Sequence, residues 1–177
     1  MPPSLTTIIG PHPAALSERE FSAQCRVTFG RASGPGGQHR NKVETAVQMT
    51  HTPTGISVTA TQRRRQSENR RVAARRLRLK LAREIRTRID PVRYRPTALW
   101  EKRRQGTKMP VNPKNRDYAA LLAEALDVVT ARAGDVGGAG GVLGVTMSQL
   151  ARLIRHDRQA FAFVNEGRLA RGLPALK

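Results

Sequence analysis

Cysteine, aromatic residues and acidic residues are scarce in this chain of 177 residues. Cys25 is the only cysteine, so neither a disulfide framework nor a cysteine-based zinc site can form within the chain. Aromatic residues make up 4% of the sequence, which favours a modest core rather than a large one. Because Cys25 lies in a run of alternating polarity, we expect a buried strand residue; a reactive thiol is the alternative.

Long apolar runs are also absent. No stretch approaches the roughly 18 apolar residues that a membrane helix needs. Residues 1–20 have no basic segment followed by an apolar one, and their first arginine is Arg19, so we expect neither a signal peptide nor a transit peptide. Together with the single cysteine, these features predict a cytoplasmic protein without a membrane segment. We also expect a monomer.

Basic residues are abundant. The chain has 32 Lys and Arg against 13 Asp and Glu, which gives a net charge of +19 and an isoelectric point near 11.7. A surplus of this size points to a polyanionic partner, and nucleic acid is the commonest polyanion. The alternative is a basic surface that only meets solvent, but such self-repulsion needs an offsetting partner. The composition therefore favours a nucleic-acid-binding protein.

The chain is expected to begin with a loose N-terminal arm over residues 1–16, where four prolines occur with few apolar anchors. Ser17 is then placed to cap a short helix that ends near Ala23. Residues 24–31 alternate between polar and apolar side chains, which is typical of a β-strand.

A β-hairpin is predicted over residues 46–61. Two alternating runs, AVQMTH and ISVTAT, are joined by TPTG. Pro53 and Gly55 suit the second and fourth positions of a type I turn. The hairpin and the preceding strand would form one small sheet.

A long helix is expected between Ser67, which can cap its start, and Pro91, which stops it. Its apolar residues recur every four positions: Ala73, Leu77, Leu81, Ile85 and Ile89. The opposite face is mainly arginine. Three strands and this helix predict an α+β fold for residues 17–90, with a small β-sheet and one long packed helix.

Residues 91–116 are rich in proline and basic residues and show no clean period. We interpret them as a basic linker that is extended or only partly ordered. Tyr94 and Trp100 lie within it. Aromatic side chains among cations can stack on bases, or they can pin the linker to a folded part of the chain, and the sequence leaves both readings open.

Residues 117–177 are expected to form a helical C-terminal module, with a flexible glycine-rich hinge at 134–141. Three positions suit helix caps: Asp117, Thr146 with Gln149 at the capping-box spacing, and Asp157. A small core is predicted from six apolar residues: Leu150, Leu153, Ile154, Phe161, Phe163 and Val164.

The stretch SGPGGQHRNKVETAV, residues 33–47, combines adjacent glycines with a neutral amide and several cations. Gly36 and Gly37 can adopt backbone conformations that other residues avoid, and they allow a backbone N–H to approach a substrate closely. Such an N–H can stabilise charge on an oxygen during acyl transfer, while the Gln38 amide orders a water or excludes larger nucleophiles. The alternative is a glycine-rich turn between strands.

Other catalytic patterns are missing from the sequence. No two histidines have metal-ligand spacing, there is no Gly-x-Ser-x-Gly elbow, and SGPGGQ is not a phosphate-binding P-loop. No base is evident beside Ser33. A catalytic loop here would work without its own acid–base pair, and we expect no metal and no cofactor.

Four signals in order resemble the catalytic domain of class-I peptide chain release factors and their codon-independent relatives. They are Gly36-Gly37-Gln38, Asn41-Lys42, the His51 to Gly55 turn, and the Arg64 to Asn69 run that opens the basic helix. The resemblance covers about residues 20–90. It implies a release-factor-like catalytic domain that hydrolyses peptidyl-tRNA on the ribosome.

The sequence departs from the family pattern in two ways. Arg40 and Arg65 stand where the family usually has an uncharged residue and a serine, and both add positive charge. Only 35 residues precede Gly36, too few for a codon-reading domain, so the chain looks like the members that rescue stalled ribosomes. Those members end in a basic disordered tail, whereas this chain ends in the helical module.

The resemblance implies a role for each motif residue. The Gln38 backbone N–H would stabilise the transition state or the departing ribose oxygen, and Gln38 is a candidate for N5-methylation by a glutamine methyltransferase. The ribosome is the implied partner, through large-subunit rRNA and P-site peptidyl-tRNA. The candidate RNA contacts are His39, Arg40, Asn41, Lys42, Arg64, Arg65, Arg71, Arg75, Arg76 and Arg78.

Two alternative functions stay open. The first is a non-catalytic ribosome- or RNA-binding protein that retains the release factor fold. The second is a hydrolase of free peptidyl-tRNA, against which the missing acid–base pair argues.

Overall fold

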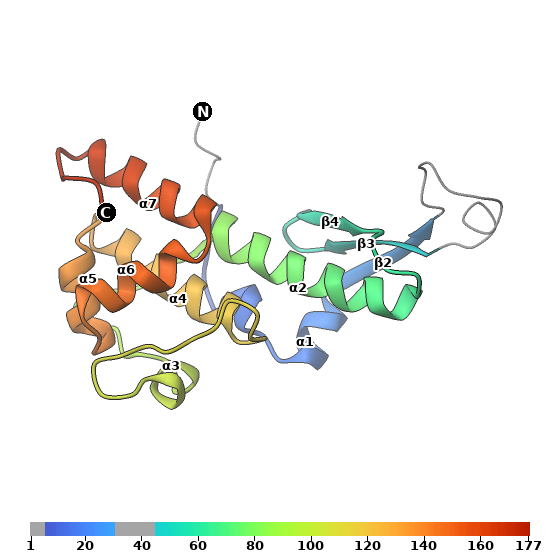
Figure 1. The fold of residues 1–177 in the computed structure, drawn as a ribbon, viewed down its shortest axis with the longest axis horizontal. Helices are drawn as coiled ribbons and strands as arrows, with labels where there is room; N and C mark the ends of the chain where they lie inside the picture. Colours follow the sequence, from blue (N-terminus) through green and yellow to red (C-terminus); the bar gives the residue numbers. More distant parts are fainter. Residues whose placement is uncertain (1–5, 31–44) are drawn as a thin grey trace. The chain divides into compact units, whose positions relative to one another are not determined.

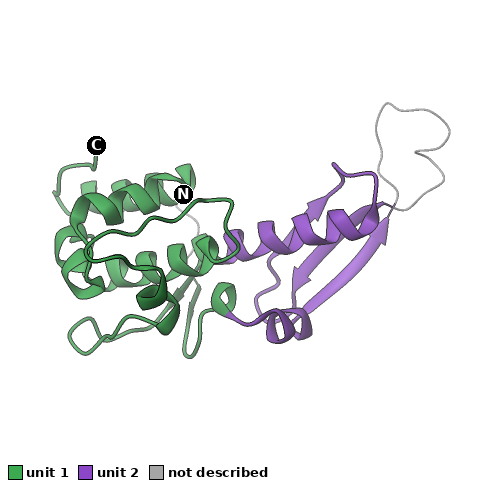
Figure 2. Ribbon diagram, turned by 60° about the horizontal axis from the view of Figure 1, so that its bottom comes forward, with its two compact units in different colours: residues 1–15, 82–177 green, residues 16–81 purple. Residues whose placement is uncertain are grey.

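The computed structural model describes residues 6–30 and 45–177. They belong to two compact units, one of residues 16–81 and one of residues 1–15 with 82–177 (Figure 1; Figure 2). Helices and small sheets occur together, so the predicted α+β class is confirmed.

The unit of residues 16–81 contains an antiparallel sheet. Its strands are β2 (Cys25–Gly30), β3 (Ala46–His51) and β4 (Ser57–Ala60), in the order β2-β3-β4. The strand and the hairpin that the sequence predicts in this part are therefore confirmed. The central strand β3 has the more buried side chains, because it pairs on both edges.

Two helices accompany this sheet. Helix α1 (Glu18–Ala23) begins after Ser17, whose hydroxyl oxygen accepts a hydrogen bond from the Glu20 backbone N–H at 3.3 Å. The Glu20 side chain in turn accepts from the Ser17 backbone N–H, which completes a capping box and confirms the predicted cap. Helix α2 (Gln66–Glu84) begins one residue before Ser67, the predicted cap.

The apolar stripe of α2 is buried as predicted, but the helix ends earlier than expected. Ala73, Leu77, Leu81 and Ile85 are all 0% exposed. Ile89, the last predicted member of the stripe, lies beyond the helix and is only half-buried. The helix ends at Glu84 rather than near Pro91, because Ile85 already belongs to a strand. A periodic stripe cannot distinguish a buried helical position from a buried strand position one turn later.

That strand, β5 (Ile85–Thr87), pairs in parallel with β1 (Thr6–Ile8). The short 3-10 helix η1 (Pro13–Ala15) follows β1 in the chain. Just before it, the buried His12 ring nitrogen Nε2 lies 3.2 Å from the Ile85 carbonyl oxygen. The loose arm predicted over residues 1–16 is therefore corrected for its described part. A three-residue strand carries too little pattern to reveal a partner so distant in the sequence.

Helix α4 (Tyr118–Ala131) forms the centre of the other unit. Its residues from Tyr118 to Val129 are all buried. It packs against α5 (Val136–Leu143), α6 (Met147–Arg155) and α7 (Arg158–Leu169). The helices α5, α6 and α7 therefore share one core with α4.

Two of the predicted helix caps in this unit are confirmed. The Thr146 hydroxyl accepts from the Gln149 backbone N–H at 3.3 Å, and an Asp157 carboxylate oxygen accepts from Ala160 N–H at 2.9 Å. The Gln149 side chain does not return to Thr146, because its oxygen accepts from the Met109 backbone N–H at 3.3 Å.

The third predicted cap is wrong. Asp117 precedes α4 but forms no side-chain cap hydrogen bond. Its carboxylate pairs instead with the guanidinium groups of Arg103 and Arg116. Two cations outcompete the backbone N–H groups for this carboxylate.

The basic segment 91–116 is ordered in part. It contains helix α3 (Ala98–Arg103), and Trp100 is 0% exposed, with its indole N–H donating to the Leu143 carbonyl at 2.8 Å. The Tyr94 hydroxyl donates to a Glu124 carboxylate oxygen at 3.0 Å. Of the two readings of these aromatic residues, the structure supports the one in which they pin the segment to the protein.

Most of the flexible hinge predicted at 134–141 belongs to helix α5, which begins at Val136. The Asp135 carboxylate caps α5 by accepting from the Gly138 backbone N–H at 2.9 Å. A Cβ added at Gly140 would lie 2.7 Å from the Val145 carbonyl oxygen. Glycine at this position thus permits close packing, a role that composition alone does not distinguish from flexibility.

The predicted small core is confirmed in part. Four of its residues are buried: Leu150, Leu153, Ile154 and Val164. Phe161 and Phe163 are only half-buried, and each lies beneath an arginine guanidinium, that of Arg155 and that of Arg86 respectively. Within the described ranges, no helix has the length and apolar character needed to cross a membrane.

Candidate functional site

The sequence assigns catalysis to Gly36, Gly37 and Gln38, which lie outside the described residues. The same holds for four candidate RNA contacts: His39, Arg40, Asn41 and Lys42. What the structure describes is the base of this segment. Strands β2 and β3 flank it, and their last register pair joins Gly30 to Ala46.

Asn69 anchors the chain where it leaves the segment. Its side chain is 0% exposed, and its amide nitrogen donates to the carbonyls of Thr45 at 2.7 Å and Arg63 at 2.9 Å. Its amide oxygen accepts from the Arg63 backbone N–H at 2.9 Å. One buried amide thus ties the start of α2 to the residue before β3, which follows Gln38 by seven positions.

His51, at the end of β3, organises the hairpin turn. Its Nδ1 lies 2.8 Å from the Thr54 hydroxyl, and its Nε2 lies 2.9 Å from the Gln24 side-chain oxygen. The ring is 1% exposed and stacks on Phe21. Burial lowers the pKa of His51, so the neutral ring is favoured. The residue therefore supports the structure of the domain.

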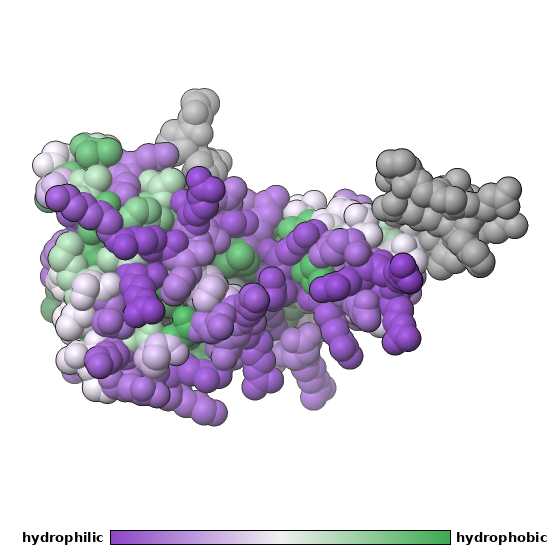
Figure 3. Space-filling view, viewed as in Figure 1, coloured by the Kyte–Doolittle hydropathy of each residue, from purple (hydrophilic) through white to green (hydrophobic). Residues whose placement is uncertain are grey.

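Arginines dominate the exposed surface of α2 and the turn before it. The exposed ones are Arg63, Arg64, Arg65, Arg70, Arg71, Arg75 and Arg76. Hydrophilic residues cover most of α2 on the face that Figure 3 presents. Arg64, Arg65, Arg71 and Arg75 form no ion pair with a described residue, so their charge is available to an anionic partner.

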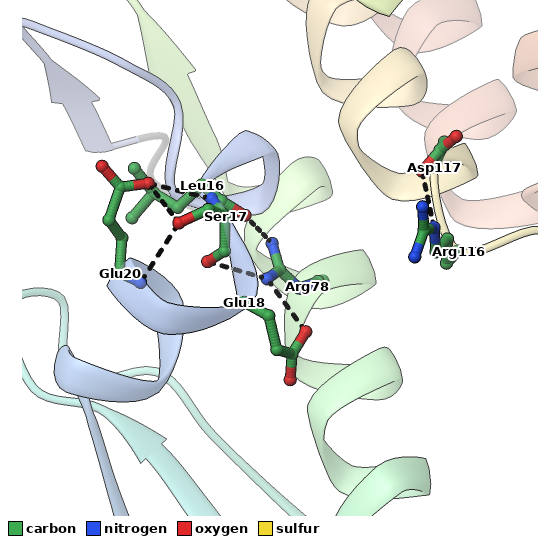
Figure 4. Close-up of polar contacts among 7 residues, drawn as sticks. All are labelled: Leu16, Ser17, Glu18, Glu20, Arg78, Arg116 and Asp117. Atoms are coloured by element: carbon green, nitrogen blue, oxygen red, sulfur yellow. Dashed lines mark hydrogen bonds and ion pairs between the residues drawn. The ribbon is translucent and has the colours of Figure 1, made fainter.

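Arg78 differs from these residues because it is enclosed. Its guanidinium donates to the Leu16 carbonyl at 2.7 Å and to the Ser17 carbonyl at 3.4 Å, and it lies 3.6 Å from the Glu18 carboxylate (Figure 4). Its Cζ is 3.9 Å from the centroid of the Phe21 ring. Arg78 therefore joins α2 to α1, a use that sequence spacing does not reveal.

Two other cations of α2 contact strand β4. Arg76 donates to the Thr59 carbonyl at 2.9 Å, and Lys80 donates to the Ser57 carbonyl at 3.2 Å. These bonds satisfy carbonyls on the edge strand of the sheet. Arg76 remains exposed and can still face an anion, whereas Lys80 is half-buried.

Two residues of this site carry no sequence-based role of their own. Asn69 precedes Ala73 by four positions, so it continues the buried stripe of α2 as a polar residue. A polar residue on a buried face needs a partner, and that signal identifies it. No comparable signal marks Gln24, whose contact with His51 depends on the pairing of β2 with β3.

Titratable groups do not assemble a metal site among the described residues: no cluster of three His, Cys, Asp or Glu side chains could hold an ion. The described part of the site therefore offers cations, buried amides and backbone groups. This chemistry suits the positioning of a polyanion.

Comparison with known proteins places this sequence in a family. The RF-1 domain matches residues 20–121, more than half of the chain. Mitochondrial peptide chain release factor 1 of Bos taurus is 37% identical over 82 residues, which are 46% of this chain and 18% of that protein. Peptide chain release factor 1 of Acidiphilium cryptum is 40% identical over 83 residues, 47% of this chain and 24% of that protein.

A third relative is an uncharacterised, mitochondrial peptide chain release factor-like protein of Saccharomyces cerevisiae. It is 44% identical over 89 residues, which are 49% of this chain and 54% of that protein. The match thus spans less than two thirds of each of these proteins. This chain belongs to the RF-1 domain family, the catalytic domain family of the class-I peptide chain release factors.

Proposed function

We propose that this protein hydrolyses peptidyl-tRNA on the ribosome and releases the nascent chain without reading a codon. The observation that carries the proposal is the Gly36-Gly37-Gln38 sequence within a matched RF-1 domain. The relatives named as release factors support the same role in translation.

The reaction is the hydrolysis of an ester. Water adds to the carbonyl carbon of the ester, and the bond to the tRNA ribose oxygen breaks, with that oxygen taking a proton as it leaves. The Gln38 backbone N–H stabilises the negative charge that develops on oxygen. The Gln38 side chain admits water to the ester and excludes larger nucleophiles. Gly36 and Gly37 allow the backbone conformation that this needs.

The buried Asn69 supports this proposal from the described part of the site. Its bond to the Thr45 carbonyl holds the base of the segment that contains Gln38. A backbone N–H acts as a catalytic donor only when it is held in place, because small displacements of reacting groups cost large factors in rate. A rigid base for the segment fits this requirement.

Ribosome binding is assigned to the exposed arginines at the start of α2. Arg64, Arg65, Arg71 and Arg75 are exposed and form no ion pair with a described residue, which suits contacts to RNA phosphates. Arg78 is omitted from this set, because its guanidinium already binds groups of its own domain.

The codon-independent mode is the finer part of the proposal. Residues 20–90 resemble both the codon-reading release factors and their codon-independent relatives, so the release test with three codon states decides this part. N5-methylation of Gln38, a monomeric state and a cytoplasmic location belong to the same proposal. Mitochondrial relatives leave an organelle as the competing location.

The test is peptide release from purified ribosomes that carry peptidyl-tRNA, with a stop codon, a sense codon or no codon in the decoding site. We expect similar release in all three cases, and loss of release in Gly37→Ala with nearly unchanged ribosome binding. Strong preference for a stop codon would contradict codon independence. Full activity of Gly37→Ala would contradict the mechanism, and binding without release by the wild type would favour the non-catalytic alternative.

Ribosome binding is tested separately by its salt dependence. In the triple variant Arg64→Gln, Arg71→Gln, Arg75→Gln, the logarithm of the ribosome-binding constant should fall less steeply with the logarithm of the salt concentration. Each lost phosphate contact lowers the magnitude of that slope by about 0.7 to 0.9. The matched control removes three exposed arginines outside α2, α6 and α7, in the triple variant Arg19→Gln, Arg88→Gln, Arg171→Gln. Equal slopes for the two variants would contradict the assignment to α2.

A further inference from the structure

A pocket of about 230 Å³ opens beside the first turns of α2, between that helix, α1 and the sheet. Phe21 and Met49 are buried and form its floor, with Val27 and Ala74 beside them. The exposed Arg70 and Arg71 lie at its rim. The pocket therefore has an apolar floor and a cationic entrance.

The contacts of Arg78 explain why this space stays open. Helical spacing places Arg71, Ala74 and Arg78 along one side of α2. Arg78 holds α1 through the Leu16 carbonyl and the Phe21 ring, one turn beyond the pocket. Helix α1 is thereby fixed beside α2, and the shorter Ala74 side chain leaves a preformed hollow between them.

Charge at the entrance favours an anionic guest. Arg70 and Arg71 form no ion pair with any described residue. Glu18 also lines the pocket, but its carboxylate lies 3.6 Å from the Arg78 guanidinium, which offsets its charge. An apolar floor next to free guanidinium groups matches a nucleotide, since a base has an apolar face and its phosphates are anionic.

We propose that this pocket receives one unstacked base of a single-stranded RNA segment, with the neighbouring phosphates held by Arg70 and Arg71. The proposal rests on the RNA binding in the proposed function and names the kind of RNA element that the domain recognises. Duplex RNA does not satisfy it, because paired and stacked bases cannot enter a pocket.

Cys25 supplies a direct reporter of occupancy. It is the only cysteine of the chain, it lines the pocket and it is half-buried. Burial raises the pKa of its thiol, so alkylation is best followed in mildly alkaline buffer. The rate of reaction with iodoacetamide then measures access to the pocket and requires no catalytic activity.

The experiment compares single-stranded RNA of mixed sequence, the same strand with abasic sites, and duplex RNA, each at a concentration that saturates binding by fluorescence anisotropy. We expect the single strand to slow alkylation of Cys25 on the order of tenfold, and the abasic strand and the duplex to leave it nearly unchanged. Equal protection by all three, or no protection by the single strand, would overturn the proposal. So would protection by a ribosomal protein but not by RNA.

Two variants sharpen the result. Ala74→Phe fills the pocket. This variant should bind the strand with bases no more tightly than the abasic strand. Arg71→Gln should weaken protection of Cys25 without such a change in volume. Arg19→Gln is the matched control, because Arg19 is exposed on the neighbouring helix α1 but neither lines the pocket nor belongs to the ribosome-binding arginines.

If Arg71→Gln and Arg19→Gln reduce protection of Cys25 equally, the pocket is not the site. The readout also separates this proposal from the catalytic one. A protein that binds single strands and protects Cys25 but releases no peptide would leave the pocket assignment intact and overturn the hydrolysis.

Discussion

The guanidinium of Arg78 lies over the ring of Phe21, with Cζ 3.9 Å from the ring centroid. The same guanidinium donates to the Leu16 carbonyl at 2.7 Å. A planar cation is needed for both contacts at once, because one face covers the ring while the N–H groups point to backbone oxygens. Among the many arginines of α2, this one stabilises the domain.

We predict that Arg78→Gln lowers the free energy of unfolding of residues 16–81 by roughly 1–3 kcal/mol, since it removes a cation–π contact and leaves the Leu16 carbonyl without this donor. Arg78→Lys should recover only part of the loss, because an ammonium cannot make both contacts. Urea unfolding followed by the reactivity of Cys25 reports on this unit. The control Arg75→Gln should leave the midpoint unchanged; equal effects at the two positions would contradict the special role of Arg78.

His51 predicts a pH dependence of stability in the same unit. Burial lowers its pKa below the ordinary value of 6.5, so the unfolded chain takes up a proton more readily than the folded one. This contribution to stability is therefore complete above pH 6.5 and is lost as the pH falls below it. Unfolding followed by the reaction of Cys25 with dithiodipyridine, a reagent that reacts with thiols in mild acid, between about pH 7.5 and about pH 5.5 should show the loss.

The variant His51→Gln isolates this effect from the carboxylates, which also titrate at lower pH. The free energy of unfolding of the wild type should exceed that of His51→Gln by an amount that shrinks as the pH falls. A difference that is independent of pH would show that His51 titrates equally in the folded and unfolded states.

Two neighbouring glycines of α5 should respond in opposite directions. A Cβ at Gly140 would lie 2.7 Å from the Val145 carbonyl oxygen, so Gly140→Ala should destabilise the unit by roughly 1–3 kcal/mol. Gly141 has nothing within 4 Å of such a Cβ, and Gly141→Ala should stabilise by up to about 1 kcal/mol. Fluorescence of Trp100, the only tryptophan, follows unfolding of this unit. Stabilisation by both variants would support the flexible-hinge interpretation instead.

Asn69 should matter for the rate of release more than for ribosome binding. In Asn69→Ala the Thr45 carbonyl loses its donor, and the segment that contains Gln38 loses its anchor. If the proposed function holds, the maximal release rate should fall on the order of ten- to hundredfold with little change in half-saturation. Cys25 reactivity verifies the fold, and the exposed Gln62→Ala is the control in the adjacent turn. A change confined to half-saturation would contradict a positioning role.

The ordering of residues 117–177 around α4 also changes how that region can be tested. Truncation after Arg132 would remove α5, α6 and α7 and strip the buried face of α4. Such a chain would lose stability for structural reasons. Whether α6 and α7 contact the ribosome is therefore tested with charge variants of their exposed residues, which leave the core intact.

Local features could be predicted from the sequence because they depend on neighbours in the chain. The caps at Ser17, Thr146 and Asp157 need only a side-chain oxygen and a backbone N–H two or three residues ahead. The hairpin needs alternating polarity around a turn, and the stripe of α2 needs one helical period. The motifs that indicate the family are likewise contiguous.

Tertiary structure decided every feature that depends on a distant partner. Strand β1 pairs with β5, beginning with Thr6 opposite Ile85. The buried Trp100 donates its indole N–H to the Leu143 carbonyl. The Asp117 carboxylate pairs with Arg103 instead of capping its own helix. Composition marks 134–141 as flexible, yet the approach of Val145 makes Gly140 a packing residue. Likewise, the sequence presents the arginines of α2 as equivalent, and only the packing of α1 against that helix distinguishes Arg78 from the rest. The reason is that a side chain's role follows from which group meets it, and in these cases that group lies far away in the sequence.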